Sequence, residues 1–368
     1  MNYNTDIESQ TITINNITYS RNDIVDVSEK DVPFSAELLT FLREWYNSSK
    51  YMIAHSSGST GTPKKLKIEK QRMLQSALLT CQFLDLQRGD SALLCMNLKY
   101  IGAKMVVVRS LLAGLNLVEV KASGNPMVCI DATDFAAMTP LQVFNSLQEP
   151  KQKAKLMAIR HLIIGGGSID ENLSKELSNF PNTIWSTYGM TETLSHIALR
   201  QINGESASEW YTPFENVTIS LSESQTLVID APAVSKIILE TNDIAEINDK
   251  GQFRILGRSD NIINSGGVKI QIEEIETILR DWIDTDFMIT SVPDSKFGEI
   301  VVLLIKGENY LDKIQDICNG KLPEYWIPKA IYSIPEIPYT ETNKLNRKEA
   351  KLIANTLHKN TKSGLDLK

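Results

Sequence analysis

A dense run of small hydroxylated residues and glycines is the strongest chemical signal in the sequence. Residues 55–65 read HSSGSTGTPKK, between an apolar strand segment and a long helical one. Backbone N–H groups and hydroxyls packed this closely can surround nucleotide phosphates, and Lys64 would add positive charge. The spacing of a Walker loop is missing. A surface loop can have the same composition, but the position between a strand and a helix favours phosphate binding.

Four further short motifs follow this run along the chain. They are residues 188–192 (YGMTE), 241–243 (TND), 257–263 (GRSDNII) and 338–344 (PYTETNK). Together with residues 57–64 (SGSTGTPK), they resemble the motifs of the acyl-CoA synthetase, luciferase and peptide-synthetase adenylation superfamily. Each motif alone is weak evidence, but five in the family's order would rarely coincide by chance. The resemblance implies an ATP-dependent ligase that joins a carboxylic acid to AMP and then to a thiol.

The resemblance implies ATP, Mg²⁺ and coenzyme A as cofactors, with coenzyme A as the acyl acceptor. Glu192 would hold the Mg²⁺, since a hard cation seeks a carboxylate. Thr191 would contact the α-phosphate, and both residues are expected to be catalytic. The β- and γ-phosphates would be held by Ser56, Ser57, Gly58, Ser59, Thr60, Gly61 and Lys64.

The adenosine part of ATP is assigned in the same way. A glycine turn at Gly165, Gly166 and Gly167 resembles the family's turn beside adenine, where missing side chains let the backbone approach a flat ring. Tyr188 would stack on that ring. Asp243 resembles the carboxylate that accepts hydrogen bonds from both ribose hydroxyls, with Arg258 as the nearby donor. For an isolated Asp or Arg, a surface ion pair is the commoner explanation.

Lys344 resembles the family's catalytic lysine, which bridges the attacking carboxylate and the α-phosphate. The family usually has Gly before this lysine, and Asn343 stands there instead, a residue that also tolerates left-handed backbone. Asp260 falls at the family's hinge. The resemblance implies that the small domain rotates there after adenylation and presents Gly266 and Gly267 to the coenzyme A channel.

The acid is harder to predict. Lys99 and His196 could pair with a substrate carboxylate or carbonyl, although a solvent-facing side chain is an equal explanation for each. Gly102 opens the next helix. Residues 188–198, together with Gly102, resemble most the o-succinylbenzoate-CoA ligases of menaquinone biosynthesis, which bind an aromatic keto-diacid. The short portion before residue 55 suits a compact form of such a ligase.

Two alternatives stay open at this stage. An enzyme that loads an aryl or amino acid onto a carrier protein would share all five motifs, although the Asp that amino-acid users place in the pocket could not be located. A nucleotide-binding protein without catalysis is a further alternative, which the presence of Lys344, Glu192 and Asp243 disfavours.

Composition points to small-molecule chemistry. The 368 residues carry a net charge of −7 and no long basic run, which argues against nucleic acid as a partner. The four cysteines lack CxxC spacing, which suggests a reducing cytoplasm. We expect no secretion signal and no membrane span, because no apolar run is long enough. The sequence leaves a homo-oligomer open.

Alternating apolar strands and amphipathic helices from about residue 50 predict an α/β fold. We expect a large adenylation domain over residues 1–259, with a small β-rich subdomain at about 200–258. A smaller, mobile α+β domain over 260–368 would carry Lys344. Ile12, Ile14, Ile17 and Tyr19 around Asn15 and Asn16 predict a short hairpin. The polar tail after about Lys359 is expected to fray.

Overall fold

The computed structural model describes residues 3–55, 65–167, 169, 171–307, 311–340 and 345–363. The predicted phosphate-binding segment at 56–64 and the predicted catalytic Lys344 lie outside the described residues. The chain divides into two compact units. The first comprises Met1–Ser220, Ile229–Leu239 and Ile247–Arg254, and the second comprises Leu221–Val228, Glu240–Glu246 and Ile255–Lys368.

A nine-stranded sheet forms the centre of the first unit, in the order β11-β10-β9-β8-β7-β5-β6-β1-β2. The six strands from β9 to β1 are parallel, and β10, β11 and β2 pair antiparallel at the two edges. This sheet confirms the expected α/β fold class. The strands are β1 (Ile12–Ile14), β2 (Ile17–Tyr19), β5 (Ser91–Leu94), β6 (Asn116–Glu119), β7 (Phe135–Met138), β8 (His161–Ile164), β9 (Ile184–Gly189), β10 (His196–Gln201) and β11 (Thr212–Pro213).

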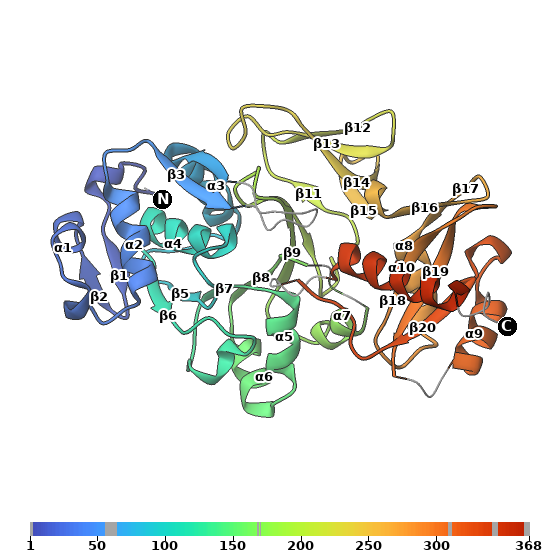
Figure 1. The fold of residues 1–368 in the computed structure, drawn as a ribbon. Coiled ribbons are helices and arrows are strands. Elements are labelled where there is room, and N and C mark those ends of the chain that lie inside the picture. Colours follow the sequence, from blue (N-terminus) through green and yellow to red (C-terminus); the bar gives the residue numbers. More distant parts are fainter. Residues whose placement is uncertain are drawn as a thin grey trace. The chain divides into compact units, whose positions relative to one another are not determined.

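Helices cover both faces of this sheet, and Figure 1 shows α4 and α5 on opposite sides of the strands. Leu93, Ala136 and Leu162 point to the face covered by α5 (Pro140–Leu147), α6 (Pro150–Met157) and α7 (Glu171–Leu177). The alternate strand residues point to the other face, because successive side chains of a strand alternate. There α4 (Ile101–Ala113) contacts the strands and α3 (Lys70–Phe83) packs on α4.

Local sequence signals set the ends of these elements. Thr139 caps α5 in a reciprocal capping box with Gln142, and Pro140 takes the first helical position. Gly114 ends α4 with φ of 68°. The predicted hairpin is also present, since Asn15 and Asn16 have φ of 48° and 68° in the two-residue turn between β1 and β2.

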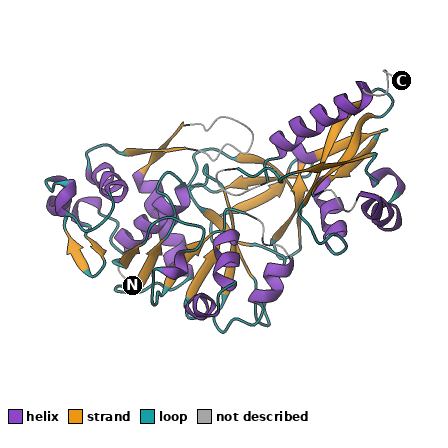
Figure 2. Ribbon diagram, turned by 60° about the horizontal axis from the view of Figure 1, so that its bottom comes forward, coloured by secondary structure: helices purple, strands orange, loops and turns teal. Residues whose placement is uncertain are grey.

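The strands on either side of residues 56–64 do not belong to the large sheet. β3 (Tyr51–His55) and β4 (Lys65–Glu69) pair antiparallel with each other and form a sheet of their own. Figure 2 draws them as a separate pair of strands. The helices α1 (Arg21–Val25) and α2 (Ala36–Tyr46) come before this strand pair in the chain. The helix α2 buries Leu38, Leu42 and Trp45.

A four-stranded sheet occupies the region where short strands are expected. Its order is β12-β13-β14-β15, and its residues are divided between the two units. The strands are β12 (Thr218–Leu221), β13 (Thr226–Asp230), β14 (Leu239–Ile247) and β15 (Phe253–Arg258).

The rest of the second unit is a mixed sheet between helices. Ile289 and Leu303 belong to an apolar cluster on one face, and Met288 and Leu304 belong to another on the opposite face. The strands are β16 (Ile262–Ser265), β17 (Val268–Gln271), β18 (Phe287–Asp294), β19 (Gly298–Lys306) and β20 (Ala330–Ile334). The helices are α8 (Ile272–Arg280), α9 (Leu311–Lys321) and α10 (Arg347–Ser363). The helix α10 continues to Ser363, past the point where fraying is expected.

In the part of the chain that the structure describes, no helix combines the length and the apolar character needed to cross a membrane. Cys81, Cys95 and Cys318 are buried and Cys129 is exposed, and all four are free thiols.

Candidate active site

The carboxyl ends of β5, β7, β8 and β9 meet at one edge of the large sheet. The chain leaves β5 for β6 on one side and later returns to β7 on the other. Open α/β sheets bind ligands beyond the carboxyl ends of their strands at such a topological switch point. The acid candidates Lys99 and Gly102 follow β5, the glycine turn follows β8, and Tyr188 lies near the end of β9.

The glycine turn is shaped by the neighbouring strand. A Cβ atom on Gly165 would lie 2.2 Å from the Thr187 hydroxyl, and the Gly165 N–H donates to the Met138 carbonyl at 3.0 Å. Gly166 has φ of 81°. The fold itself therefore favours glycine at positions 165 and 166, because a side chain at either position would clash or strain the backbone. Their contact with adenine stays a prediction.

Tyr188 belongs to a cluster of three aromatic rings in the first unit. Its ring centroid lies 5.0 Å from that of Phe253, edge to face, and 5.8 Å from that of Tyr211. Tyr211 and Phe253 stack on each other, and the Tyr211 hydroxyl is 2.9 Å from the Ser186 hydroxyl. These contacts fix the half-buried Tyr188 ring, which suits a stacking platform.

The turn that carries Thr191 and Glu192 is held by a residue that the sequence analysis did not single out. The buried Thr193 hydroxyl accepts a hydrogen bond from the Met190 N–H at 3.0 Å and lies 2.7 Å from the Ser195 carbonyl oxygen. The Leu194 N–H donates to the Thr191 carbonyl, and Leu194 has φ of 67°. This small network fixes the backbone at the two predicted catalytic positions.

Glu192 has the properties that a magnesium ligand needs. It is exposed and has neither a hydrogen bond nor an ion pair with any described residue. No group of three or more His, Cys, Asp or Glu side chains that could hold a metal occurs among the described residues. A single open carboxylate fits Mg²⁺, which keeps several waters and takes its other ligands from substrate phosphates.

His196 lies in a buried polar cluster, together with Arg109 from the middle of α4. The Arg109 guanidinium donates to the hydroxyls of Thr80 at 3.1 Å and Ser195 at 2.8 Å. His196 Nε2 is 3.0 Å from the Thr80 hydroxyl, and Nδ1 is 3.3 Å from that of Ser195. Burial, aided by the charge of Arg109, lowers the pKa of His196 well below its usual value, so the ring is neutral.

Arg109 is the main functional candidate that the sequence analysis missed. It is 1% exposed, its Nε atom has no hydrogen-bond partner, and it makes no ion pair with a described residue. Burial lowers the pKa of Arg109 to about 10, so the guanidinium remains charged at neutral pH. A buried charge without a counter-ion is costly, and an anionic ligand would remove that cost.

The two other acid candidates lie on the segment after β5. Lys99 is exposed, and its ammonium lies 5.7 Å from the centroid of the Tyr100 ring. A Cβ atom on Gly102 would meet only the Met96 side chain, at an ordinary 3.6 Å. The fold therefore does not require glycine at position 102.

In the second unit, Arg258 joins two predicted site residues. It donates two hydrogen bonds of 2.8 Å to Asp260 and one of 3.0 Å to Asp243. The hydrogen bonds from Arg258 are the main cause that lowers the pKa of Asp260 below its usual value. The predicted ribose carboxylate and the predicted hinge thus share one guanidinium.

Gly266 and Gly267 form the two-residue turn of the β16–β17 hairpin, with φ of 58° and 85°. Both positive values match a type I′ turn, so the turn alone accounts for both glycines. Their role beside coenzyme A stays a prediction.

The residues flanking 341–344 are anchored in the second unit. Tyr339 and Leu345 form an isolated antiparallel bridge, and the Asn346 N–H donates to the Pro338 carbonyl at 2.8 Å. Arg347, three residues after Lys344, makes two hydrogen bonds of 2.7 Å to the buried carboxylate of Glu276.

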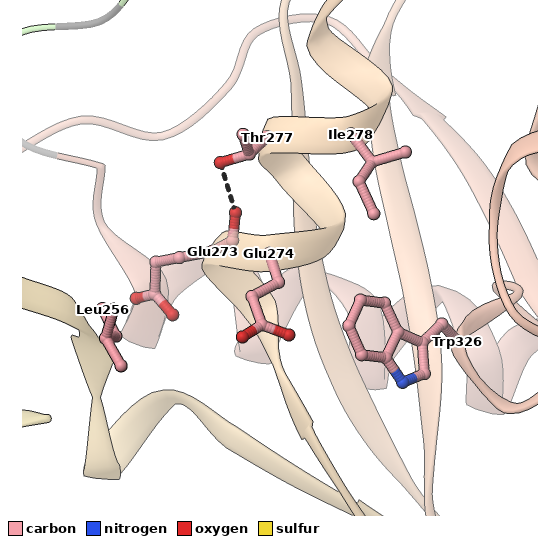
Figure 3. A pocket seen from close by; sticks show the side chains of 6 residues that line it. All are labelled: Leu256, Glu273, Glu274, Thr277, Ile278 and Trp326. Carbon is pink, nitrogen blue, oxygen red and sulfur yellow. Dashed lines mark hydrogen bonds between the residues drawn. The ribbon is translucent and has the colours of Figure 1, made fainter.

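A separate hollow of about 330 Å³ lies beside α8 in this unit. Figure 3 shows Glu273 and Glu274 projecting from the first turn of α8, with Trp326 across from Glu274. None of the predicted site residues is among those that line it.

Residues 11–233 match a family model described as AMP-binding enzyme. The chain belongs to this family. The 2-succinylbenzoate–CoA ligases of Listeria monocytogenes serovar 1/2a and Staphylococcus epidermidis RP62A are each 24% identical to it, over 84% and 81% of this chain and 71% and 69% of theirs. The resemblance inferred from the motifs is therefore confirmed.

Solved structures agree on the fold. An acyl-CoA synthetase (AMP-forming)/AMP-acid ligase II-like protein from Dyadobacter fermentans is 29% identical, with a TM-score of 0.61 over 90% of this chain and 97% of that one. The o-succinylbenzoate CoA synthetase of Bacillus subtilis, in complex with its acyl-adenylate, is 20% identical, with a TM-score of 0.68 over 81% of this chain and 68% of that one.

Proposed function

We propose that the protein is an ATP-dependent, AMP-forming ligase that converts o-succinylbenzoate to its coenzyme A thioester in the cytoplasm. Family membership and the names of the relatives support this reaction. The observation that carries the choice of acid is the buried Arg109, which lacks a carboxylate partner among the described residues.

In the first step, a carboxylate oxygen of the acid attacks the α-phosphorus of ATP and pyrophosphate leaves. Residues 56–61 and Lys64 hold the departing phosphates, Thr191 contacts the α-phosphate, and Lys344 bridges the reacting carboxylate and phosphate. Mg²⁺ at Glu192 supplies neutralisation of phosphate charge when it is bound. Tyr188 and the glycine turn hold adenine, while Asp243 and Arg258 hold the ribose.

In the second step, the thiol sulfur of coenzyme A attacks the acyl carbonyl carbon, the thiol proton is lost, and AMP leaves. AMP is a good leaving group, so this step requires no protein nucleophile. Rotation at Asp260 withdraws Lys344 and brings Gly266 and Gly267 to the passage for the thiol arm.

Arg109 explains why a diacid suits this protein. o-Succinylbenzoate carries two carboxylates, of which only one is activated. The other stays anionic throughout and needs a cation inside the protein. The hydroxyls of Thr80 and Ser195 hold the guanidinium in place, and the neutral His196 adds no competing charge.

The direct test supplies ATP, Mg²⁺, coenzyme A and o-succinylbenzoate and follows AMP and pyrophosphate. We expect equal release of both products, dependent on the acid. Pyrophosphate release that is independent of this acid, or stronger with another member of an aryl and short-chain acid panel, would contradict the choice of substrate. Replacing coenzyme A by a carrier-protein thiol tests the alternative acceptor.

Substitution of Arg109→Met tests the role of the guanidinium. A charge-assisted hydrogen bond is worth about 1.5–3 kcal/mol, so kcat/KM for o-succinylbenzoate should fall about 10- to 150-fold. Turnover of a monocarboxylic aryl acid such as benzoate should change little. Arg160→Met, which removes a half-exposed arginine paired with Asp90, is the matched control. Equal losses on both acids, with unchanged melting temperature, would contradict this role.

A further inference from the structure

A polar cavity of about 560 Å³ lies at the base of the β3–β4 ladder, at the end away from residues 56–64. It is lined by the short 3₁₀ helix Ile7–Ser9, by residues 47–50, and by the residues at the start of β3 and α3. None of the residues proposed for ATP, acid or coenzyme A binding is among these. Its volume is in the range of sites for small organic ligands.

The cavity contains a buried ammonium group. Lys70 is 2% exposed, and its Nζ atom donates to the carbonyl and the side-chain oxygen of Asn47 at 2.9 and 3.0 Å. An ammonium group has three N–H donors, so one donor has no partner among the described residues. Lys70 also makes no ion pair with them. The end of α2 at Asn47 offers only partial negative charge.

Two of the carboxylates near this ammonium are already ion-paired. Glu8 is ion-paired with Arg21, and Glu69 is ion-paired with Arg72 and Lys236. Glu44 acts on Lys70 only through its field. Burial lowers the pKa of Lys70, opposed by the charges of Glu44 and Glu8 and aided by that of Arg21, as expected for an ammonium that lacks a contacting counter-ion.

The unused side chains in the cavity can each donate a hydrogen bond. Lys50 has no ion pair, and the side chains of Ser48 and Gln71 have no hydrogen bonds, among the described residues. In addition, no side chain caps the first turn of the 14-residue helix α3. From this arrangement we propose that the Lys70 cavity binds a small organic anion through a carboxylate or phosphate group.

The test follows the chemical reactivity of Lys50, which is exposed at the rim of the cavity. The full-length protein is reductively methylated in sodium phosphate, sodium succinate or sodium chloride at matched ionic strength, and labelling is read by mass spectrometry. Phosphate or succinate should slow labelling of Lys50 at least about threefold at saturation. Labelling of the exposed Lys121 should stay unchanged. The anion that protects Lys50 more strongly from methylation shows whether the ligand group is a phosphate or a carboxylate.

Variants separate this cavity from the nucleotide site. Lys70→Met should abolish protection of Lys50, whereas Lys64→Ala should leave it intact, because Lys64 belongs to the proposed phosphate loop. If Lys70→Met fails to fold, Lys50→Ala serves instead, and loss of the anion-induced rise in melting temperature is the readout. Equal labelling of Lys50 in all three salts, or protection that Lys64→Ala removes, would overturn the proposal.

Discussion

The glycines of the candidate site differ in what they do for the fold. A Cβ atom on Gly189 would lie 2.2 Å from the Ser195 carbonyl oxygen, so glycine is needed there for the bulge between β9 and β10. Gly165 is needed for its approach to Thr187. Gly102, by contrast, has room for a side chain. We infer that the missing side chain at position 102 leaves space for the acid.

Gly102→Ala should therefore separate folding from function. Alanine is favoured over glycine in a helix by up to about 1 kcal/mol, so stability should be unchanged or slightly raised. Acyl-adenylate formation with o-succinylbenzoate should fall, mainly through a higher KM for the acid. Gly320→Ala is the control, since this helical glycine in α9 has open space around it. Unchanged kinetics of Gly102→Ala would place the acid elsewhere.

The Arg258–Asp260 pair predicts a pH effect on stability. Because its pKa is lowered in the folded protein, Asp260 contributes stability that is present above its unfolded pKa of about 3.9 and is lost as pH falls through the folded pKa. Asp260→Asn should melt earlier than the wild type near pH 7. The difference should shrink below about pH 4. A difference in melting temperature that is constant from pH 3 to 7 would rule out this ion pair as its cause.

Candidate site residues could be proposed from the sequence where a motif singles them out. Tyr188, Glu192 and Asp243 belong to short patterns of unusual residue types, and the structure describes all three. Arg109 could not be found in this way, because it is a single basic residue in an otherwise apolar helix. Only the structure shows that it is buried without an acidic partner. Thr193 was missed for a similar reason, since its contacts are to backbone atoms of its own turn.

At the scale of elements, one buried ion pair connects three parts of the second unit. Glu276 on α8 binds Arg347 at the start of α10, and Glu276 also accepts a hydrogen bond from the Ile289 N–H of β18 at 2.9 Å. Arg347 donates in addition to the Ile289 carbonyl at 3.2 Å. The pair therefore anchors the chain three residues beyond the proposed catalytic lysine.

Glu276→Gln should destabilise the second unit strongly. Loss of one partner leaves the largely buried Arg347 without a counter-ion, at a cost of about 3 kcal/mol. The loss of stability is measured as the shift in the urea midpoint of unfolding, followed by fluorescence. Glu274→Gln on the same helix removes an exposed carboxylate and should change little. The double variant Glu276→Gln with Arg347→Met should be less destabilised than the single one, and additive losses would contradict the coupling.

Elements with strong local signals were predicted well. The Asn15–Asn16 hairpin depends on turn chemistry that is visible in the sequence. The helix α10 was not predicted. Its buried side chains include the small Ala350 and Ala354, while the large Leu352 is 61% exposed, so its apolar periodicity is weak. The helix α10 packs on β18, so its position follows from tertiary contacts and not from an apolar pattern in the sequence.

At the scale of the whole molecule, each unit carries residues that the sequence motifs single out. Tyr188 and Glu192 belong to the first unit, and Asp243 and Arg258 belong to the second. In the proposed mechanism, the two half-reactions make different demands on the second unit: adenylation needs Lys344 at the nucleotide, whereas thioester formation does not.

Lys344→Ala should lose adenylation selectively. We expect pyrophosphate release to fall by two or more orders of magnitude, as for removal of a group that stabilises transition-state charge, about 2.7–4 kcal/mol. Thioester formation from supplied o-succinylbenzoyl-AMP and coenzyme A should remain near the wild-type rate. Retained adenylation would contradict the catalytic role proposed for Lys344. Equal loss of both half-reactions would contradict the proposed domain rotation.

The independence of β3 and β4 from the nine-stranded sheet has an energetic consequence. An isolated two-stranded pair is only marginally stable, so it can open without the cooperative loss of the parallel strands. Amide hydrogens of Ile53 and Lys67 should exchange with deuterium faster than those of Ala136 and Ile163. Saturating ATP should slow deuterium exchange at Ile53 and Lys67 and leave exchange at Ala136 and Ile163 unchanged. Nucleotide binding would then be linked to a small, separately melting part of the protein.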